Sequence, residues 1–222
     1  MKAMILAAGR GERLRPLTDS IPKPLVPVAG KPLIVYHIEK LAAAGISEIV
    51  INHAWLGHKL VDTLGDGSQW QVNIQYSAED SALETGGGIK QALNFLGNEP
   101  FLVINGDIFI DQLPEIKPLM PNMLAHLWLV NNPSQHPEGD FALSQGLVAE
   151  QGSTKLTFSG MGIYHPQLFN DTPEGAFALA PLLRQAMKTK QVSGNHFDHF
   201  WCDVGTIQRH TQIEARESKK VR

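Results

Sequence analysis

Apolar stretches with two different periodicities alternate along the first half of the chain. Four short stretches have the apolar run or the alternation of a strand: residues 4–8, 48–52, 72–76 and 101–104. Three stretches between them carry apolar side chains at helical spacing: residues 32–45, 56–64 and 86–96. Strands that alternate with helices favour a parallel sheet covered on both faces, so the pattern predicts an α/β fold.

The second half of the chain is less regular. Four more stretches are predicted strands: residues 124–130, 141–147, 156–164 and 197–202. Two stretches are predicted helices: residues 178–188 and 207–217. A polar loop spans residues 131–140, and a basic end with Lys219, Lys220 and Arg222 is expected to fray. Because no repeat, low-complexity segment or long linker interrupts the chain, we expect a single domain over residues 1–222.

The first predicted strand runs into a loop rich in glycine and positive charge. Gly9 and Gly11 stand where a chain can turn tightly, because glycine has no Cβ. Arg13, Arg15 and Lys23 follow within the same loop. Glycines let backbone N–H groups approach a ligand, and the cations that follow can neutralise its charge. Together they predict a binding site, or polyanion seat, for a polyanion such as a triphosphate. A glycine turn by itself fits a purely structural role equally well.

Two familiar glycine motifs do not fit the chain. The dinucleotide-binding fingerprint needs a third glycine where Leu14 stands. A P-loop needs glycine and lysine followed by serine or threonine, whereas Gly88 is followed by Ile89 and Lys90. The predicted polyanion seat is therefore of another kind.

Composition narrows the function classes. The formal net charge is −3, which argues against a general nucleic-acid binding surface. Cys202 is the only cysteine, so no internal disulfide can form. No apolar run approaches the roughly 20 residues of a membrane span, and no signal segment is apparent. We expect a cytoplasmic protein with neither nucleic acid nor membrane as a partner.

Two aspartates follow predicted strands at distant positions in the chain. Asp107 ends the segment that begins at Asn105, and Asp203 follows the last predicted strand. Ligands of open α/β sheets bind beyond the carboxyl ends of the strands. Mg²⁺ on phosphates takes few protein carboxylates, so Asp107 and Asp203 are a candidate metal-ligand pair. A turn role for Asp107 and a capping role for Asp203 are equally compatible with the residues alone.

The joint pattern resembles the signature of the sugar-phosphate nucleotidyltransferase family. The segments that carry the resemblance are Gly9, Gly11 and Arg13, Arg15-Pro16-Leu17-Thr18, Pro22-Lys23-Pro24, Asn105-Gly106-Asp107 and Trp201-Cys202-Asp203-Val204-Gly205-Thr206. The resemblance implies a Rossmann-like three-layer α/β/α fold with a mostly parallel mixed sheet. It also implies an enzyme that joins a sugar 1-phosphate to a nucleoside triphosphate and releases pyrophosphate.

The resemblance implies a role for the loop and for both acids. The loop residues implied in nucleotide binding are Ala8, Gly9, Gly11, Glu12, Arg13 and Lys23. Arg13 would hold the β- and γ-phosphates, and Lys23 would lie beside the α-phosphate. Asp107 and Asp203 would hold Mg²⁺, so the expected catalytic residues are Arg13, Lys23 and Asp107. From the residues alone, a solvated surface lysine fits Lys23 better.

Contacts to the base and the sugar are implied as well. Glu79, Gly87 and Gly88 are expected beside the base. The expected sugar contacts are Asn105, Asp140, Ser159 and Gly160. Without the resemblance, the glycines are a turn that starts a helix, and Asp140 is an ordinary exposed acid.

Three short motifs narrow the resemblance: residues 52–57 (NHAWLG), 83–89 (LETGGGI) and 139–141 (GDF). They look most like the branch that transfers UMP from UTP to N-acetylmuramate α-1-phosphate in peptidoglycan recycling. The expected partners are therefore UTP and a sugar 1-phosphate, with Mg²⁺ as cofactor. Many relatives bind hexose hydroxyls through the acid of a Glu-Lys-Pro motif, and residues 155–160 contain no such acid.

Two alternatives stay open. The same fold would serve another acceptor, such as glucose or mannose 1-phosphate or an alcohol phosphate. A regulatory module that senses a nucleotide without catalysis would also need a polyanion seat, but it would not need a cation beside the α-phosphate. The expected assembly is a monomer or a small homo-oligomer.

Overall fold

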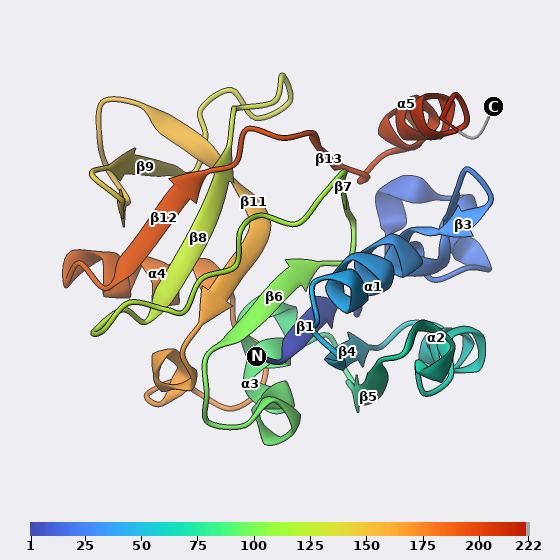
Figure 1. Cartoon of the computed structure of the whole chain (residues 1–222), viewed down its shortest axis with the longest axis horizontal. Helices are drawn as coiled ribbons and strands as arrows, with labels where there is room; N and C mark the ends of the chain where they lie inside the picture. The colour runs from blue at the N-terminus through green and yellow to red at the C-terminus, as the bar shows by residue number, and fades with distance from the viewer. Residues whose placement is uncertain (221–222) are drawn as a thin grey trace.

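A nine-stranded mixed sheet forms the centre of the protein, whose computed structural model describes residues 1–220 (Figure 1). The strands, in chain order, are β1 (Ala3–Leu6), β4 (Glu48–His53), β5 (Asn73–Ala78), β6 (Phe101–Asn105), β8 (Ala125–Val130), β9 (Phe141–Ser144), β10 (Leu147–Ala149), β11 (Lys155–Tyr164) and β12 (Val192–His196). Across the sheet their order is β5-β4-β1-β6-β11-β8-β12-β10-β9. Only β11 and β10 run against the other strands described, so the expected mostly parallel mixed sheet is confirmed.

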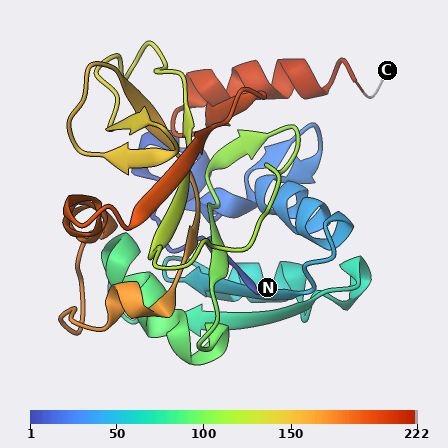
Figure 2. The same ribbon diagram turned by 60° about the vertical axis from the view of Figure 1, so that its left-hand side comes forward.

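Helices cover both faces of the sheet. The α-helices described are α1 (Leu33–Ala43), α2 (Gly57–Leu64), α3 (Glu84–Leu96), α4 (Leu179–Lys188) and α5 (Ile207–Glu217). α1 and α2 pack on one face, and α3 and α4 pack on the other. Figures 1 and 2 show α5 apart from these two layers, on the side of the molecule away from α3. The three-layer α/β/α arrangement predicted above is confirmed.

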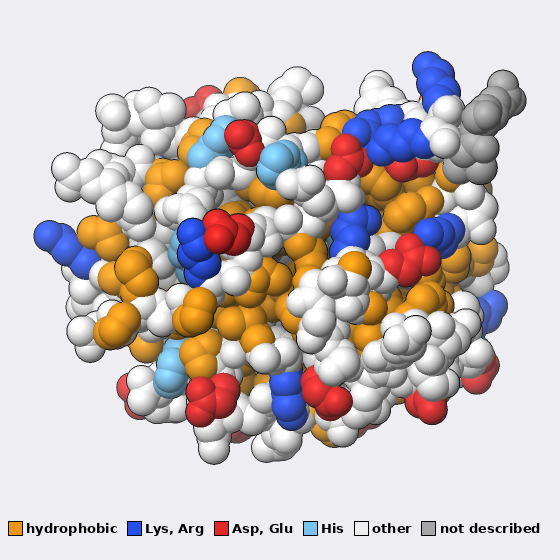
Figure 3. Space-filling view, in the orientation of Figure 1, with side chains coloured by type: hydrophobic (Ala, Val, Ile, Leu, Met, Phe, Trp, Pro, Cys, Tyr) orange, Lys and Arg blue, Asp and Glu red, His pale blue; other side chains and the backbone are white. Residues whose placement is uncertain are grey.

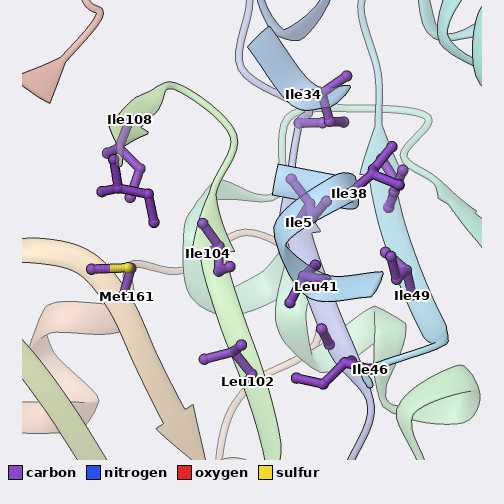
Figure 4. Packing of buried hydrophobic residues seen from close by; sticks show 14 of the residues in the cluster. Ile5, Ile34, Ile38, Leu41, Ile46, Ile49, Leu102, Ile104, Ile108 and Met161 are labelled. Atoms are coloured by element: carbon purple, nitrogen blue, oxygen red, sulfur yellow. The ribbon is translucent and has the colours of Figure 1, made fainter. Parts of the chain in front are cut away.

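The alternation of β1 shows how the sequence builds the two layers. Ile5 belongs to the core on the face of α1, where it packs with Ile34 and Ile38 (Figure 4). Met4, its neighbour, belongs to the core on the opposite face, together with Ile89 of α3. Successive side chains of a strand point to opposite faces, so an entirely apolar strand has to be covered twice.

The order in which successive strands are added to the sheet changes side at β1. From β1 the chain passes through α1 to β4 and through α2 to β5, always outward on one side. It then returns through α3 to β6, which pairs with the other edge of β1. This topological switch leaves a crevice at the carboxyl ends of β1 and β6, where ligands of such sheets bind.

Smaller elements join the two ends of the chain. β7 (Ile108–Ile110) pairs with β13 (Trp201–Asp203), and β2 (Pro27–Val28) pairs with β3 (Lys31–Pro32). A small apolar cluster lies between these pairs and α5: Val28, Leu33, Phe109, Val204 and Ile213. It holds the terminal helix against the N-terminal loop, so residues from both ends reach the same crevice.

Two predicted strands differ from the structure. The strand predicted over residues 141–147 is a hairpin of β9 and β10, because Gln145 and Gly146 both have positive φ (50° and 76°) and form a tight turn. The strand predicted over residues 197–202 is wrong in its position. β12 lies earlier, paired in parallel with β8, and β13 begins only at Trp201.

The basic end is ordered as far as it is described. The Lys220 ammonium lies 2.9 Å from a Glu217 carboxylate oxygen and 3.2 Å from an Asp111 carboxylate oxygen. Fraying is therefore wrong for Lys220, and Arg222 lies outside the described residues.

Over residues 1–220, no helix has the length and apolar character needed to cross a membrane. On the face drawn in Figure 3, basic and acidic side chains are interspersed.

We predict that the core on the α1 face carries much of the stability. Ile38 is fully buried there, so Ile38→Ala should lower the free energy of unfolding by about 2–5 kcal/mol through lost burial and a residual cavity. Ile207→Ala is the matched control, because Ile207 lies on a helix but is 44% exposed. It should cost less than about 0.5 kcal/mol. Equal losses in urea unfolding of the two variants would contradict this packing.

Candidate functional site

A cavity of about 780 Å³ opens at the switch point between β1 and β6. Its walls come from the loop after β1, the ends of β4 and β6, the start of α3 and the segment after β13. The predicted residues that line it are Ala8, Gly9, Gly11, Glu12, Arg13, Lys23, Glu79, Asn105 and Asp107. Three cations, Arg10, Arg13 and Lys23, stand around this space. The fold thus brings the predicted polyanion seat to one place, except for Arg15, which does not line the cavity and pairs with Asp19 over 2.6 Å.

Gly11 shapes the loop after β1. Its φ is +69°, and a Cβ there would lie 2.9 Å from Thr18 Cγ2 and 3.0 Å from Lys23 Cβ. Thr18 Oγ1 donates a hydrogen bond of 2.8 Å to the Gly11 carbonyl. Glycine is thus required by conformation and by space. By contrast, a Cβ on Gly9 would meet nothing within 4 Å, which leaves the backbone there open toward the cavity.

Gly106 brings the end of β6 against the end of β1. Its N–H donates to the Leu6 carbonyl over 2.8 Å. A Cβ on Gly106 would lie 2.6 Å from that same carbonyl oxygen, so only glycine allows this approach. The contact fixes Asp107, the next residue, at the edge of the cavity.

Lys23 and Asp107 form an ion pair across the cavity wall. The Lys23 ammonium lies 2.5 Å from Asp107 Oδ2, and the Lys23 side chain is only 10% exposed. Lys23 is therefore not a solvated surface lysine. A buried ammonium without a partner would be costly, which explains why the lysine is held against the carboxylate.

Asp203 stands close to Asp107 through the pairing of β13 with β7. The Val204 N–H donates to the Asp107 carbonyl over 2.8 Å. Arg209 of α5 binds Asp203 twice, from Nη2 to Oδ2 over 3.0 Å and from Nε to the main-chain carbonyl over 2.6 Å. Asp203 Oδ1 is buried and has no hydrogen-bond partner among residues 1–220. Helix α5 therefore fixes one carboxylate oxygen and leaves the other free.

The Arg13 side chain lies close to Asp203 Oδ1. A Cβ on Gly205 would lie 2.6 Å from Asp203 Oδ1 and 3.0 Å from Arg13 Nη2. Gly205 also lines the large cavity. Arg13, Lys23, Asp107 and Asp203 thus surround one region, as the sequence predicts.

The donor set around this region suits a hard divalent cation. Asp107, in the turn between β6 and β7, and Asp203, at the end of β13, supply carboxylate oxygens, and Asp203 Oδ1 is an unused buried acceptor. Within residues 1–220, no group of three or more His, Cys, Asp or Glu side chains is arranged around a common metal position. Two carboxylates without a closed protein cage fit an ion that takes its other ligands from phosphates and water.

Glu79 lines the large cavity, but its carboxylate is engaged within the protein. Glu79 Oε1 accepts 2.6 Å from Asn52 Nδ2, and Glu79 Oε2 accepts 3.2 Å from the Leu83 N–H. Asn52 Oδ1 in turn accepts 2.9 Å from the Ala7 N–H. The chain of bonds ties β1, β4 and the start of α3 together. A contact from Glu79 to the base stays a prediction.

The triple glycine at the start of α3 packs against other parts of the protein. Gly86 faces the Phe177 ring, Gly87 faces the Gly175 carbonyl, and a Cβ on Gly88 would lie 2.6 Å from Glu79 Oε1. Residues 82–85 line the large cavity, whereas residues 86–88 do not. Contacts from Gly87 and Gly88 to a nucleotide stay predictions, and close packing accounts for their lack of side chains.

A second cavity of about 220 Å³ adjoins the first and shares Asn105 and Asp107 with it. Ser159 and Gly160 line it from an irregularity in β11, where the pairing with β8 shifts its register. Three of the predicted sugar contacts, Asn105, Ser159 and Gly160, therefore meet in one cavity.

Asp140 is the exception among the predicted sugar contacts, because it does not line this second cavity. Its Oδ2 accepts 2.8 Å from the Phe158 N–H, and its Oδ1 lies 3.1 Å from His136 Nε2. The acid therefore holds β11 and the histidine. Direct binding of a sugar by Asp140 stays a prediction.

The sequence reasoning missed three residues that shape the site. Arg209 lies six residues after Asp203, on a predicted helix, and its position after the Trp-x-Asp-x-Gly-Thr segment was the available signal. Arg10 lies over the Trp55 ring, with Cζ 4.8 Å from the ring centroid, and both line the large cavity. His37 of α1 bonds to the Ile108 carbonyl, next to Asp107, and no sequence pattern marks it.

Comparison with known proteins gives consistent findings. A family model described as nucleotidyl transferase matches residues 2–126. The N-acetylmuramate alpha-1-phosphate uridylyltransferase of Neisseria meningitidis is 52% identical over 97% of each chain. The protein of that name from Caulobacter vibrioides is 35% identical over 96% of each chain. A crystal structure of a putative glucose-1-phosphate thymidylyltransferase from Bacillus anthracis has a TM-score of 0.82 at 22% identity, covering 98% of this chain and 95% of that one, which shows a shared fold.

His37 supports the segment that carries Asp107. It is 1% exposed, and its Nε2–H donates to the Ile108 carbonyl over 2.9 Å. Burial lowers the pKa of His37 from 6.5 to about 4, and the nearby Lys40 ammonium contributes to the same shift. The ring is therefore neutral at neutral pH and resists protonation in the folded state.

We predict that His37 makes the fold acid-sensitive. Between pH 6.5 and about 4 the unfolded chain binds a proton at this residue and the folded chain does not, so stability is lost as the pH falls. The loss should amount to about 3 kcal/mol. His37→Gln keeps an N–H donor but has no ring that can be protonated. In urea unfolding, the stability that this variant loses between pH 6.5 and about 4 should therefore be about 3 kcal/mol smaller than the loss in the wild type. Exposed His58→Gln is the matched control and should behave as the wild type. Parallel pH profiles for His37→Gln and the wild type would contradict the prediction.

Proposed function

The chain belongs to the nucleotidyl transferase family, and we propose that it transfers UMP from UTP to N-acetylmuramate α-1-phosphate, releasing pyrophosphate. One observation carries the proposal. The large cavity and the small cavity meet at Asp107, where Lys23 and Asp203 also converge. The choice of nucleotide and sugar rests on the similarity over almost the whole chain to the two uridylyltransferases.

The reaction needs positioning and charge compensation. An anionic phosphate oxygen of the sugar phosphate attacks the α-phosphorus of UTP, and the bond from that phosphorus to the oxygen bridging to the β-phosphate breaks. The nucleophile is already deprotonated, so no general base is required. The barrier arises from bringing two polyanions together and from charge that spreads over the α-phosphate oxygens.

Arg13 and Lys23 each have a place in this scheme. The large cavity takes the nucleotide, with the β- and γ-phosphates beside Arg13 and the open backbone around Gly9. Lys23 lies at the junction of the cavities, where the α-phosphate and the incoming sugar phosphate meet. Asp107 and Asp203 would hold a divalent cation, Mg²⁺ in our proposal, which when bound would neutralise phosphate charge.

The proposed product is UDP-N-acetylmuramate. It would place the enzyme in peptidoglycan recycling, acting in the cytoplasm where UTP is available. We also propose that residues 1–222 form one domain, since a single sheet and its covering helices include elements from both ends of the chain. A module that only senses nucleotides would not need Lys23 buried beside the α-phosphate position.

A coupled pyrophosphate-release assay tests the substrate assignment. UTP and Mg²⁺ with N-acetylmuramate α-1-phosphate should give turnover, and glucose or mannose 1-phosphate should give much less. Turnover on a hexose phosphate alone would reassign the acceptor. Absence of turnover on every acceptor, with nucleotide binding retained, would favour the sensing module.

We predict that Asp203→Asn lowers kcat/KM by about 100-fold or more, because it removes a negative charge from the proposed metal site without changing the shape of the side chain. Activity should fall far more than folding stability, because Asn keeps an oxygen that can accept from Arg209, and the Mg²⁺ concentration for half-maximal activity should rise. Asp198→Asn is the matched control, since that side chain is 77% exposed and outside both cavities. Loss of activity in proportion to loss of folded protein would count against the assigned role.

A further inference from the structure

We propose that the small cavity beside Asp107 includes a subsite for an acidic substituent on the acceptor sugar, and that the His136 ring binds its carboxylate. The inference rests on the proposed function and deepens it. N-acetylmuramate differs from N-acetylglucosamine by a lactyl ether, so its carboxylate is the one charged group that tells the two sugars apart. Something in the acceptor cavity has to recognise that charge.

The two cavities set the direction of the acceptor. They share Asn105 and Asp107, so a sugar phosphate in the small cavity has its phosphate at this junction. Gln135, His136 and Thr157 form another part of the wall of the same cavity. A sugar held at the junction therefore directs its ring substituents toward these side chains.

The ionisable side chains of the small cavity are of two kinds, carboxylates and an imidazole. Asp107 and Asp203 lie where the phosphate and the divalent cation meet. Among the described residues that line the small cavity, His136 alone has a side chain that can carry a positive charge. In its charged form the ring donates from both nitrogens, so it can bind two carboxylates at once.

Asp140 prepares His136 for this contact. Its Oδ1 lies 3.1 Å from His136 Nε2, and its Oδ2 accepts from the Phe158 N–H over 2.8 Å, so the acid is held in place. With Nε2 directed at Asp140, the other ring nitrogen, Nδ1, has no hydrogen-bond partner within residues 1–220. Asp140 does not line the small cavity, and both of its carboxylate oxygens have partners within the protein. It acts as a positioning residue for the ring.

The His136 ring is not needed to close the loop on which it lies. Asn132 Nδ2 already donates 2.9 Å to the Pro137 carbonyl and 2.9 Å to the Lys155 carbonyl. The His136 N–H also donates 2.9 Å to the Pro133 carbonyl, and that bond belongs to the backbone. Substitution of the ring should therefore leave the loop in place.

The test compares two acceptors that differ only in the lactyl group. Steady-state kinetics with UTP and Mg²⁺ are measured for N-acetylmuramate α-1-phosphate and N-acetylglucosamine α-1-phosphate. In His136→Gln, kcat/KM for the first should fall about 10- to 100-fold, mainly through KM, because a charge-assisted hydrogen bond to the ground state is lost. The value for the second should stay within about twofold.

Two further variants sharpen the result. Asp140→Asn keeps an oxygen for the Phe158 N–H but removes the charge beside the ring, so it should lower the preference for the lactyl sugar to a lesser degree. His199→Gln is the matched control, because His199 lies outside the small cavity and beside Asp198. It should leave the preference unchanged.

The outcomes separate the two proposals. In one outcome the wild-type enzyme turns over N-acetylmuramate α-1-phosphate, and His136→Gln keeps the wild-type preference for this sugar over N-acetylglucosamine α-1-phosphate. That outcome overturns the subsite and leaves the proposed function standing. Equal losses on both sugars would make His136 a loop residue and also overturn the subsite. A wild-type enzyme without turnover on N-acetylmuramate α-1-phosphate overturns the proposed function and the subsite with it.

Discussion

The Lys23–Asp107 ion pair is the constraint around which the site is built. It joins the N-terminal loop to the turn after β6, and it places a largely buried ammonium where, in the proposed reaction, the triphosphate and the sugar phosphate would meet. Asp203 is balanced in the same way by Arg209. Each acid therefore has its own cation, so the site gathers carboxylates without a large excess of negative charge. An anionic substrate can then approach, since the repulsion it meets is already compensated.

The fold serves this arrangement through close contacts at strand ends. Gly106 lets β6 approach the Leu6 carbonyl, and Asn52 links β1 to Glu79. On the other side, a small apolar cluster seats α5 so that Arg209 reaches Asp203. Residues from the first 25 positions and from the last 25 thus form one wall, with the sheet as the rigid body between them. Side chains fixed on strands and packed helices hold their geometry better than side chains on free loops.

The sequence alone predicted those residues of the site that belong to short, recognisable motifs. Glycines, cations and strand-end acids mark the cavity because backbone conformation and charge are properties of short segments. It could not find contacts that depend on distant segments. The polar sequence of β12 forms a strand because it pairs with β8, and Gly194 leaves room there for the Leu127 carbonyl. The expected contact of Asp140 with a sugar stays a prediction, and only the fold shows that its carboxylate also bonds to the Phe158 N–H and to His136.

A crystal structure with a non-hydrolysable UTP analogue, Mg²⁺ and the sugar phosphate tests the central claim most directly. We predict an ion bound to Asp107 and to Asp203 Oδ1, the α-phosphate beside Lys23, and the sugar phosphate entering from the small cavity. A triphosphate bound elsewhere, or an ion that touches neither aspartate, would contradict it.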